Sequence, residues 1–337
     1  METKSLEEVY SSLDEHTRII YVVPLIRYSH QKTDYLYLLY EDLIKSEKFD
    51  IQAISVINHF KLVAGILKNK HAILHYHWLE FQDFKSLLGM PWKILCIRLF
   101  KLFGGKIVWT LHNEFPHDQK YLKLHSFLHR KMASWADKLH VHCNTAVEIM
   151  SNRLDVSKNK FFVRPHPKFP STIQSKNEAI THLIEEYGCD LQPGIPLLLM
   201  FGNISRYKQI EKVAEIVNDL PLESKLLIVG PIKKGNMSLY KELKNLEQGS
   251  QRIKLIPRFI KEEHVPWFYN AADICLFNYR EILSSGGIHL ALSYQRIIIS
   301  PDKGCISEIQ GAQNVHLFEN EEEFKKLLIR EIKSTNA

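Results

Sequence analysis

The feature that most constrains the fold is a stretch near the end of the chain, where an apolar run opens into a loop of serine and glycine. The run Ile274–Phe277 shows no helical period and is therefore typical of a buried parallel strand. Ser285–Gly287 follows, and residues 288–294 are predicted to form a helix. A second apolar run at Arg296–Ser300 completes the pattern. This order predicts one βαβ unit with a glycine-rich loop between its first strand and its helix.

The glycine-rich loop is predicted to bind phosphate. The backbone N–H groups that begin a helix have no partner within the helix and carry the positive end of its dipole. Glycine lets a diphosphate approach those groups closely. Ser285, Gly286 and Gly287 occupy the positions where such donors are expected. The Pro301-Asp-Lys-Gly304 turn that follows the second strand closes the unit.

The residues around this loop resemble those of glycosyltransferases with the GT-B fold, and more narrowly those of bacterial exopolysaccharide transferases. The shared signature has an aromatic–Arg pair, a Ser-Gly triplet, an Ala-Leu-Ser triplet and a Pro-Asp turn. The resemblance implies an α/β protein of GT-B architecture, with two Rossmann-like domains facing each other across a cleft, in which this segment binds a nucleotide sugar. The matching residues are Tyr279-Arg280, Ser284-Ser285-Gly286, Ala291-Leu292-Ser293 and Ser300-Pro301-Asp302.

Length and composition fit a soluble or peripherally attached protein. With 337 residues, 45% hydrophobic and 24% charged, the chain is long enough for two domains. Its five cysteines contain no Cys-x-x-Cys pair, which is typical of a reduced, cytoplasmic protein. The first residues lack the basic start and apolar core of a signal peptide, and no apolar run is long enough to span a bilayer. We therefore expect a cytoplasmic protein, with peripheral attachment to the inner face of the plasma membrane as an extension of that prediction.

The net charge of +6 is unevenly distributed. No acidic residue occurs from Phe84 to Asn113, so an anionic partner is expected there. Nucleic acid is not expected, because the total charge is modest and no nucleic-acid-binding motif is present. Residues 87–103 are too short and too charged to span a bilayer, but such a helix can lie in the interface of an anionic membrane. The alternative is a core helix with one basic edge. The basic residues of the stretch are Lys85, Lys93, Arg98, Lys101 and Lys106.

The first half of the chain alternates strand and helix patterns, which predicts a parallel sheet covered by helices on both faces. Ligands of such sheets bind beyond the carboxyl ends of the strands, so the loops that follow strands are candidate site loops. Two of these loops are rich in polar side chains. The predicted strands are 18–23, 51–57, 72–75, 106–111 and 138–142, and the loop residues are His77, Trp78 and Glu80 after the third strand and His112, Asn113, Glu114 and Asp118 after the fourth.

These loops are predicted to hold the acceptor and the catalytic groups. The resemblance places His112 where the family has a histidine that approaches the transferred sugar. An enzyme that inverts the anomeric centre also needs a base near the acceptor hydroxyl, and we favour Asp118 or Glu80 for that role. His77, Trp78, Asn113 and Glu114 are expected to contact acceptor or sugar. A zinc site at His75 and His77 is less well supported, because no third ligand follows at a recognisable spacing.

Prolines mark the boundary between two halves. The predicted organisation is an acceptor-side Rossmann-like domain at residues 1–168, a linker and domain entry at 169–192, a nucleotide-sugar domain at 193–320 and a C-terminal helix at 321–337. The second half repeats the strand and helix alternation without repeating the sequence of the first.

A second donor-binding loop is predicted after the first strand of the second half. Retaining GT-B enzymes carry there a Gly-Arg pair, four residues and a lysine, and the two cations clamp the donor diphosphate. Gly202 and Lys208 match, whereas Asn203 stands where the arginine is expected. Arg206 is the candidate substitute, since a guanidinium binds phosphate oxygens in pairs. The alternative is an Arg and a Lys that only cap a solvated loop.

The glutamates of the family are only partly matched. Glu281 lies near the position of an earlier glutamate of the family, and Leu290 stands where retaining members often place a ribose-binding glutamate. The donor base and the stereochemical course therefore stay open at this point.

The residues and the resemblance together predict a hexosyltransferase that uses a UDP- or GDP-sugar and a lipid-linked or growing bacterial polysaccharide acceptor. No essential metal or cofactor is expected, because Lys208, Arg206 and helix amides can stabilise the diphosphate. A GT-B sugar-nucleotide epimerase and a non-catalytic nucleotide-binding module are the alternatives. The basic, apolar stretch favours a transferase over an epimerase, and the charged strand-end loops favour an enzyme over a binding module.

Overall fold

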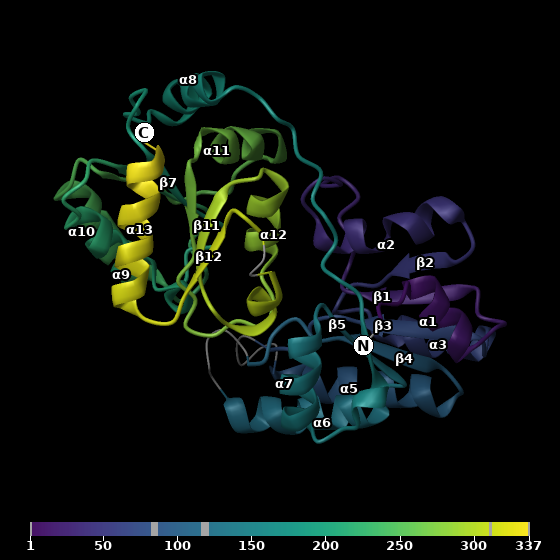
Figure 1. Cartoon of the computed structure of the whole chain (residues 1–337). Helices are drawn as coiled ribbons and strands as arrows, with labels where there is room; N and C mark the ends of the chain where they lie inside the picture. Colours follow the sequence, from purple (N-terminus) through teal and green to yellow (C-terminus); the bar gives the residue numbers. More distant parts are fainter. Residues whose placement is uncertain (1, 82–86, 116–120, 310–311, 336–337) are drawn as a thin grey trace. The chain divides into compact units, whose positions relative to one another are not determined.

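The computed structural model describes residues 2–81, 87–115, 121–309 and 312–335 (Figure 1). The chain divides into two compact units, Met1–Pro167 and Lys168–Ala337. Each unit contains a six-stranded sheet, and every pair of neighbouring strands within it is parallel. Within the described ranges, no helix has the length and apolar character needed to cross a bilayer.

The sheet of the first unit has the strand order β2-β1-β3-β4-β5-β6. The chain runs outward from β1 to β2 and then reverses direction across the sheet, so the topological switch point lies between β1 and β3. This is the order of doubly wound folds of the flavodoxin type rather than of the dinucleotide-binding type. The strands are β1 Ile19–Val23, β2 Asp50–Ala53, β3 Ala72–Tyr76, β4 Lys106–Thr110, β5 Lys138–Val141 and β6 Phe161–Val163.

The helices of the first unit cover both faces of the sheet. Because parallel crossovers are right-handed, α3, α5, α6 and α7 lie on one face and α2 lies on the other. Figure 1 shows α5 and α6 on one side of strands β3 to β5 and α2 on the opposite side. The helices are α1 Leu6–Leu13, α2 Tyr35–Ser46, α3 Phe60–Lys68, α5 Met90–Leu102, α6 Leu122–Trp135 and α7 Asn144–Leu154, and a single 3-10 turn, η1 Lys158–Lys160, precedes β6.

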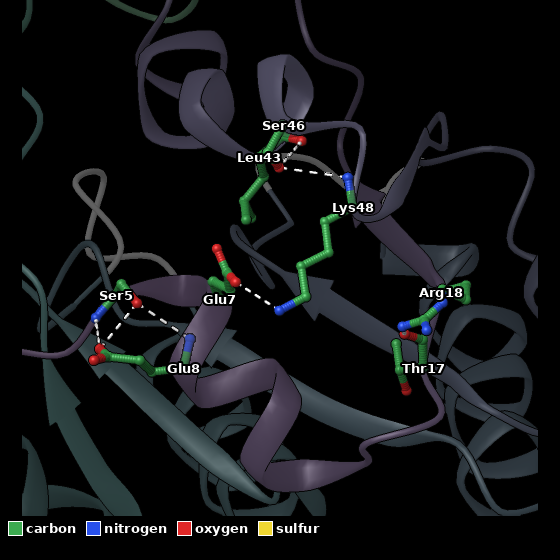
Figure 2. Close-up of polar contacts among 8 residues, drawn as sticks. All are labelled: Ser5, Glu7, Glu8, Thr17, Arg18, Leu43, Ser46 and Lys48. Atoms are coloured by element: carbon green, nitrogen blue, oxygen red, sulfur yellow. Dashed lines mark hydrogen bonds and ion pairs between the residues drawn. The ribbon is translucent and has the colours of Figure 1, made fainter.

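Helix α1 precedes the first predicted strand and was not expected from the sequence pattern. Ser5 caps it: the Ser5 hydroxyl accepts from the Glu8 amide, and the Glu8 carboxylate accepts from the Ser5 amide at 2.7 Å. An ion pair of 2.6 Å joins Glu7 to Lys48, which lies just before β2 (Figure 2). These contacts fix the helix so that Tyr10 is buried against the sheet.

The second unit has the strand order β12-β11-β10-β7-β8-β9, which is the order of dinucleotide-binding folds. Its switch point lies between β7 and β10, the two strands that precede the predicted donor-binding loops. The strands are β7 Leu197–Phe201, β8 Lys225–Val229, β9 Ile253–Ile256, β10 Ile274–Leu276, β11 Ile297–Pro301 and β12 Val315–Phe318.

The helices of the second unit enclose a core of leucine, isoleucine and valine side chains. Helix α8 falls within the segment expected to be a linker, and its cap is again a box, in which the Ser175 hydroxyl accepts from the Glu178 amide. The helices are α8 Lys176–Tyr187, α9 Ile210–Asn218, α10 Met237–Gln248, α11 Val265–Ala271, α12 Gly286–Ser293 and α13 Glu321–Thr335, with 3-10 segments η2 Arg206–Lys208, η3 Glu262–His264 and η4 Gly304–Ile309.

Candidate functional site

The predicted phosphate loop leads into the N-terminus of α12. The Ser285 hydroxyl accepts from the Ile288 amide at 3.3 Å and lies 2.8 Å from the Tyr279 hydroxyl. Ser285 therefore caps one free amide of the helix, while the amides of Gly286 and Gly287 have no acceptor within the helix. Two N–H donors and the positive end of a helix dipole are thus available to an anion at this point.

Lys208 lies at the same edge of the sheet. After β7 the backbone turns at Gly202, whose φ of +103° favours glycine, and η2 then brings the Lys208 ammonium within 3.4 Å of the Phe201 carbonyl oxygen. No carboxylate forms an ion pair with Lys208 among the residues that the structure describes. Burial lowers the pKa of Lys208 to about 8. A half-buried lysine whose ammonium has no carboxylate partner in the described part of the chain fits a site whose ligand carries negative charge.

The loops after β7 and β10 hold each other in place. The ring of Tyr207 stacks on that of Tyr279, with centroids 5.8 Å apart and planes 11° from parallel. The Arg280 amide donates to the Tyr207 carbonyl at 2.8 Å, and the Gln209 side chain donates to the Asn278 carbonyl at 3.2 Å. Lys208 and the start of α12 consequently flank one buried tyrosine at the switch point of the sheet.

The Pro301–Gly304 turn packs against the residues that precede the phosphate loop. At Gly304 φ is +57°, and a Cβ atom there would lie 2.4 Å from the Ile282 carbonyl oxygen, so only glycine allows this approach. The Lys303 ammonium donates to the Arg280 carbonyl at 2.6 Å. The Ser284 hydroxyl oxygen is buried without a hydrogen-bond partner in the described part of the chain. An oxygen of a bound ligand would satisfy it.

Arg206 faces away from this cluster. Its guanidinium forms two hydrogen bonds to Glu242 of α10, at 2.6 and 2.5 Å, and lies 3.5 Å from Glu211. To replace the family arginine, as the sequence suggested, Arg206 would have to leave Glu242. The predicted donor residues Asn203, Arg280 and Glu281 are exposed. The structure thus brings together Lys208, Tyr279 and residues 284–287, and not Arg206.

In the first unit, polar side chains recur at every second residue along the ends of neighbouring strands. Alternate residues of a strand share a face, and the parallel register sets Thr110 beside His140. Histidines from the ends of four strands therefore gather on one face of the sheet. They are His75 in β3 and His77 just after it, His112 after β4, His140 in β5 and His142 just after it, and His166 after β6.

One hydrogen-bonded chain runs through the buried part of this cluster. Tyr10 donates to His75 Nδ1 at 2.5 Å, His75 Nε2 to Thr110 at 2.7 Å, Thr110 to His140 Nδ1 at 2.9 Å, and His140 Nε2 to the Arg164 carbonyl at 3.1 Å. Burial keeps both imidazoles neutral, so each ring carries one N–H; because the Arg164 carbonyl can only accept, the N–H of His140 is at Nε2 and the direction of the other bonds follows. Burial lowers the pKa of His75 and of His140 to about 3.

A second branch reaches the predicted catalytic histidine. The Tyr40 hydroxyl lies 2.9 Å from His77 Nε2, and His77 Nδ1 lies 3.1 Å from His112 Nε2. His112 stacks on Trp78 with ring centroids 4.2 Å apart. Burial and then the neighbouring histidines hold the pKa of His77 and of His112 well below the usual range. His112 Nδ1 has no hydrogen bond within the described residues, so it is available to a substrate hydroxyl.

The remaining predicted acceptor residues connect the loops after β3 and β4. Asn113 donates to Glu80 at 3.3 Å. The Arg153 guanidinium carbon lies over the Phe115 ring, 4.0 Å from the centroid of that ring. Burial lowers the pKa of Arg153, and the nearby Glu114 and Glu80 partly oppose this change. Asp118, the other candidate base, lies outside the described residues.

The zinc alternative has no support from the ring nitrogens. Both nitrogens of His75 and both nitrogens of His77 are hydrogen-bonded to protein groups. In the described ranges, no group of three histidine, cysteine or carboxylate side chains is placed to hold a metal ion.

Several members of the histidine cluster were missed from the sequence. Tyr35 lies 3.1 Å from His142 Nε2, and His142 Nδ1 donates to the Arg164 carbonyl at 3.0 Å. A signal for them exists, because His-x-His occurs at the ends of two predicted strands and Thr-x-His at a third. The tyrosines of α1 and α2 have no such signal, since they meet the histidines only through the fold.

Comparisons with known proteins bear on the fold and on the activity. No family model matches the chain. Two curated relatives from Xanthomonas campestris pv. campestris, both GDP-mannose:glycolipid 4-beta-D-mannosyltransferases, are 25% identical over 291 residues, which cover 82% of this chain and 75% of each relative. Among solved structures, Anabaena HepE in complex with UDP aligns with a TM-score of 0.64 and 12% identity, covering 95% of this chain and 91% of HepE.

A further solved structure, sucrose-phosphate synthase from Thermosynechococcus elongatus, aligns with a TM-score of 0.66 and 14% identity, covering 95% of this chain and 90% of that one. The structural similarities show the GT-B fold with two Rossmann-like domains, which confirms the predicted fold class. Together with the curated relatives, they identify the chain as a glycosyltransferase.

Proposed function

We propose that this glycosyltransferase transfers a hexosyl group from a GDP-sugar, GDP-mannose in the first instance, to a glycolipid acceptor. The curated relatives are named for that donor and that class of acceptor. UDP is the alternative nucleotide, because the similar HepE structure contains it.

The observation that carries the proposal is the unpaired Lys208 ammonium beside the N-terminus of α12. When the bond between the sugar and the diphosphate breaks, the leaving diphosphate gains negative charge. Lys208 and the amides of Gly286 and Gly287 are held in place before that charge develops, and such donors stabilise the transition state. These groups do what a divalent ion does in other transferases, so we propose transfer without an essential metal or cofactor.

The acceptor side must remove a proton. A β-linked product from an α-linked nucleotide sugar requires inversion, in which the acceptor oxygen attacks the anomeric carbon as the bond to the diphosphate breaks. The hydroxyl proton then passes to a base within hydrogen-bond reach, for which Glu80 and Asp118 are the candidates. Neutral His112, through Nδ1, accepts a hydrogen bond from a sugar hydroxyl and orients the ring. His77, Trp78, Asn113 and Glu114 complete the acceptor side.

A glycolipid acceptor also sets the place of action. Its lipid part lies in a bilayer, whereas nucleotide sugars are water-soluble. We propose that the protein works in the cytoplasm at the inner face of the plasma membrane and attaches there peripherally through α5.

Calorimetric titration with GDP and with UDP tests the donor site. We expect GDP to bind the wild type and to bind Lys208→Ala much more weakly, while Lys212→Ala, an exposed lysine of α9, serves as the matched control. Binding of neither nucleotide would remove the transferase and the epimerase together. A mass-spectrometric screen of GDP- and UDP-sugars with a lipid-linked acceptor then identifies the product, and a changed donor sugar in the absence of acceptor would instead indicate an epimerase.

A further inference from the structure

Three neighbouring helices of the first unit form an outer layer without a single acidic residue. Helices α3, α5 and α6 lie in this order on one face of the sheet, as the right-handed crossovers require. Helix α3 packs against α5, and the Arg98 guanidinium of α5 lies 4.8 Å from the Trp135 ring centroid of α6. We call this layer the acid-free face. Its basic residues are Lys61, Lys68, Lys93, Arg98, Lys101, Lys123, Arg130 and Lys131.

Large apolar side chains are exposed between these basic residues. They come from all three helices and not from α5 alone, which was the only one expected from the sequence. Single exposed apolar residues are normal on a soluble protein, but a cluster across neighbouring helices marks an interaction surface. The exposed side chains are Phe60 and Leu67 of α3, Trp92, Leu95 and Leu102 of α5, and Leu122, Leu124 and Phe127 of α6.

An apolar groove of about 1010 Å³ runs between α5 and the end of α6. Its lining combines apolar side chains with basic ones: Leu95, Leu99, Leu102 and Trp135 together with Arg98, Lys101 and Lys160. Asp137 also lines the groove, and its carboxylate is bonded to Lys101 at 2.5 Å and to the Ile107 amide at 2.7 Å. That carboxylate is therefore already neutralised within the protein, and the groove is open to an apolar group with an anionic end.

The helices elsewhere in the molecule show that this composition is specific to these three helices. Helix α7, next to α6 on the same face of the sheet, carries Glu148. Helix α2, on the opposite side of the same sheet, carries Glu41 and Asp42, and α10 and α13 of the second unit mix lysine and glutamate. A surface that only keeps a protein in solution intersperses both signs of charge. The absence of acids from α3, α5 and α6 consequently indicates an anionic partner.

We propose that the acid-free face binds an anionic lipid bilayer and that the groove takes one acyl chain of it. Tryptophan, leucine and phenylalanine between lysines and arginines are what a bilayer interface selects, because apolar side chains enter it while basic ones meet anionic headgroups. A nucleic acid would use the charge and leave the apolar side chains in water. This proposal rests on the proposed function, because binding to a bilayer brings the enzyme to the membrane that contains a glycolipid acceptor.

Vesicle sedimentation tests the charge. We expect the wild type to bind vesicles that contain about one third phosphatidylglycerol and not vesicles of phosphatidylcholine alone, with an affinity that falls as salt rises. The decisive variants lie outside α5: Lys61→Gln/Lys68→Gln on α3 and Lys123→Gln/Lys131→Gln on α6. Each pair should weaken binding by about fivefold per lysine. Lys241→Gln/Lys333→Gln, two exposed lysines of the second unit, is the matched control and should bind as the wild type does.

Fluorescence quenching tests the insertion of apolar groups. Vesicles with brominated acyl chains should quench the tryptophan emission of the wild type, and Trp92→Phe/Trp135→Phe, which removes the exposed tryptophan of α5 and the one that lines the groove, should remove most of that effect. Trp267→Phe, in the second unit, should keep it. Absence of binding to anionic vesicles, binding that depends on α5 alone, binding without quenching, or a preference for RNA over vesicles would each overturn the proposal.

The proposed function can be judged separately from this surface. GDP titration and transfer to a detergent-solubilised acceptor should be unchanged in the lysine variants, because none of these lysines lies at a strand-end loop. Loss of vesicle binding with intact transfer would support the bilayer surface and leave the function standing. Loss of GDP binding in the same variants would show that they had damaged the fold and would contradict the assignment of these lysines to a surface role.

Discussion

The candidate site lies at the carboxyl ends of the strands of each sheet, here called the first edge in the first unit and the second edge in the second unit. The two edges differ in how many of their polar groups have hydrogen-bond partners. In the first unit, the buried histidines and tyrosines bond to one another, and burial keeps His75 and His140 neutral. In the second unit, among the described residues, the Lys208 ammonium has no carboxylate partner, the Ser284 hydroxyl has no hydrogen-bond partner, and the first amides of α12 have no acceptor within the helix. The buried interior of the first edge is satisfied within the protein, with only His112 Nδ1 left for a ligand, whereas the second edge offers several donors that suit an anion. In the function that we propose, this difference separates the roles: the first edge positions the acceptor and its proton, and the second binds the charged diphosphate.

The largest expected effect tests whether the first edge supplies a base. In an inverting mechanism, replacement of the base removes general-base catalysis, which contributes roughly 10²- to 10⁴-fold. We therefore expect either Asp118→Asn or Glu80→Gln to lower kcat by that factor with little change in donor KM.

The anomeric configuration of the product, measured by NMR, is the independent check on the base. An inverted product together with full activity in both carboxylate variants would refute the assignment. A retained product would remove the need for a base, and His112→Ala should then be the more harmful change on this edge.

The next largest effect concerns the second edge. Lys208→Ala should lower kcat/KM by about 10²- to 10³-fold, because it removes the positive charge that we propose stabilises the leaving diphosphate. Lys212→Ala, an exposed lysine on the next helix, should leave kcat/KM within about twofold, as for most surface substitutions. Equal activity of Lys208→Ala and wild type would show that the diphosphate binds elsewhere.

The same lysine gives donor binding a pH dependence. Burial lowers the pKa of Lys208 to about 8 in the ligand-free protein, so the ammonium is lost as the pH rises through 8. The affinity for GDP should fall by up to about tenfold per pH unit above that value. Calorimetric titrations at increasing pH measure the fall, and Lys208→Met should abolish it. A profile that is flat above pH 8 in the wild type would show that this ammonium does not contact the nucleotide.

Much of this contrast could be predicted from the sequence, but unevenly. The second edge has local signals: Ser285-Gly286-Gly287 precedes a helix, and Lys208 follows a glycine after a strand. The first edge is built from distant segments, because Tyr10, Thr110 and His140 meet only when α1 is docked and three strands are in register. Even so, the Ser5 and Glu8 capping box and the repeated His-x-His pairs were readable signals that the strand pattern alone did not use. The ion pair between Arg206 and Glu242 could not be predicted. Glu242 lies 36 residues further along the chain, and nothing in the sequence shows whether the guanidinium binds that carboxylate or a ligand.

A smaller effect tests the neutrality of the first edge. The pKa values of His75 and His140 are about 3 in the folded protein, against about 6.5 in an unfolded chain. Between those two pKa values the unfolded state binds more protons than the folded state. The neutral histidines therefore make their whole contribution to the free energy of unfolding above pH 6.5, and that contribution falls as the pH drops toward 3. Each such histidine contributes a slope of about 1.4 kcal/mol per pH unit.

Urea unfolding of the wild type and of His140→Gln between pH 7 and pH 5 measures this slope. The variant keeps a neutral side chain that can donate and accept, and its slope should be smaller by the contribution of one histidine. The exposed His16→Gln variant is the matched control. Parallel slopes in wild type and His140→Gln would mean that His140 is not held neutral by burial.

The smallest expected effect concerns Arg206, the residue on which sequence and structure differ most. Its guanidinium is half-exposed and bonded to Glu242, and such surface pairs contribute only about 0 to 1 kcal/mol. Arg206→Ala should therefore change kcat/KM by less than about fivefold. Glu242→Gln sharpens the test, because it releases the guanidinium without removing it. If Arg206 can reach a diphosphate, that variant should bind GDP more tightly than the wild type, and the gain should vanish in the double variant Arg206→Ala/Glu242→Gln. A loss of about 100-fold on Arg206→Ala alone would instead mean that the arginine leaves Glu242 when the donor binds, and that both cations clamp the diphosphate as in the related enzymes.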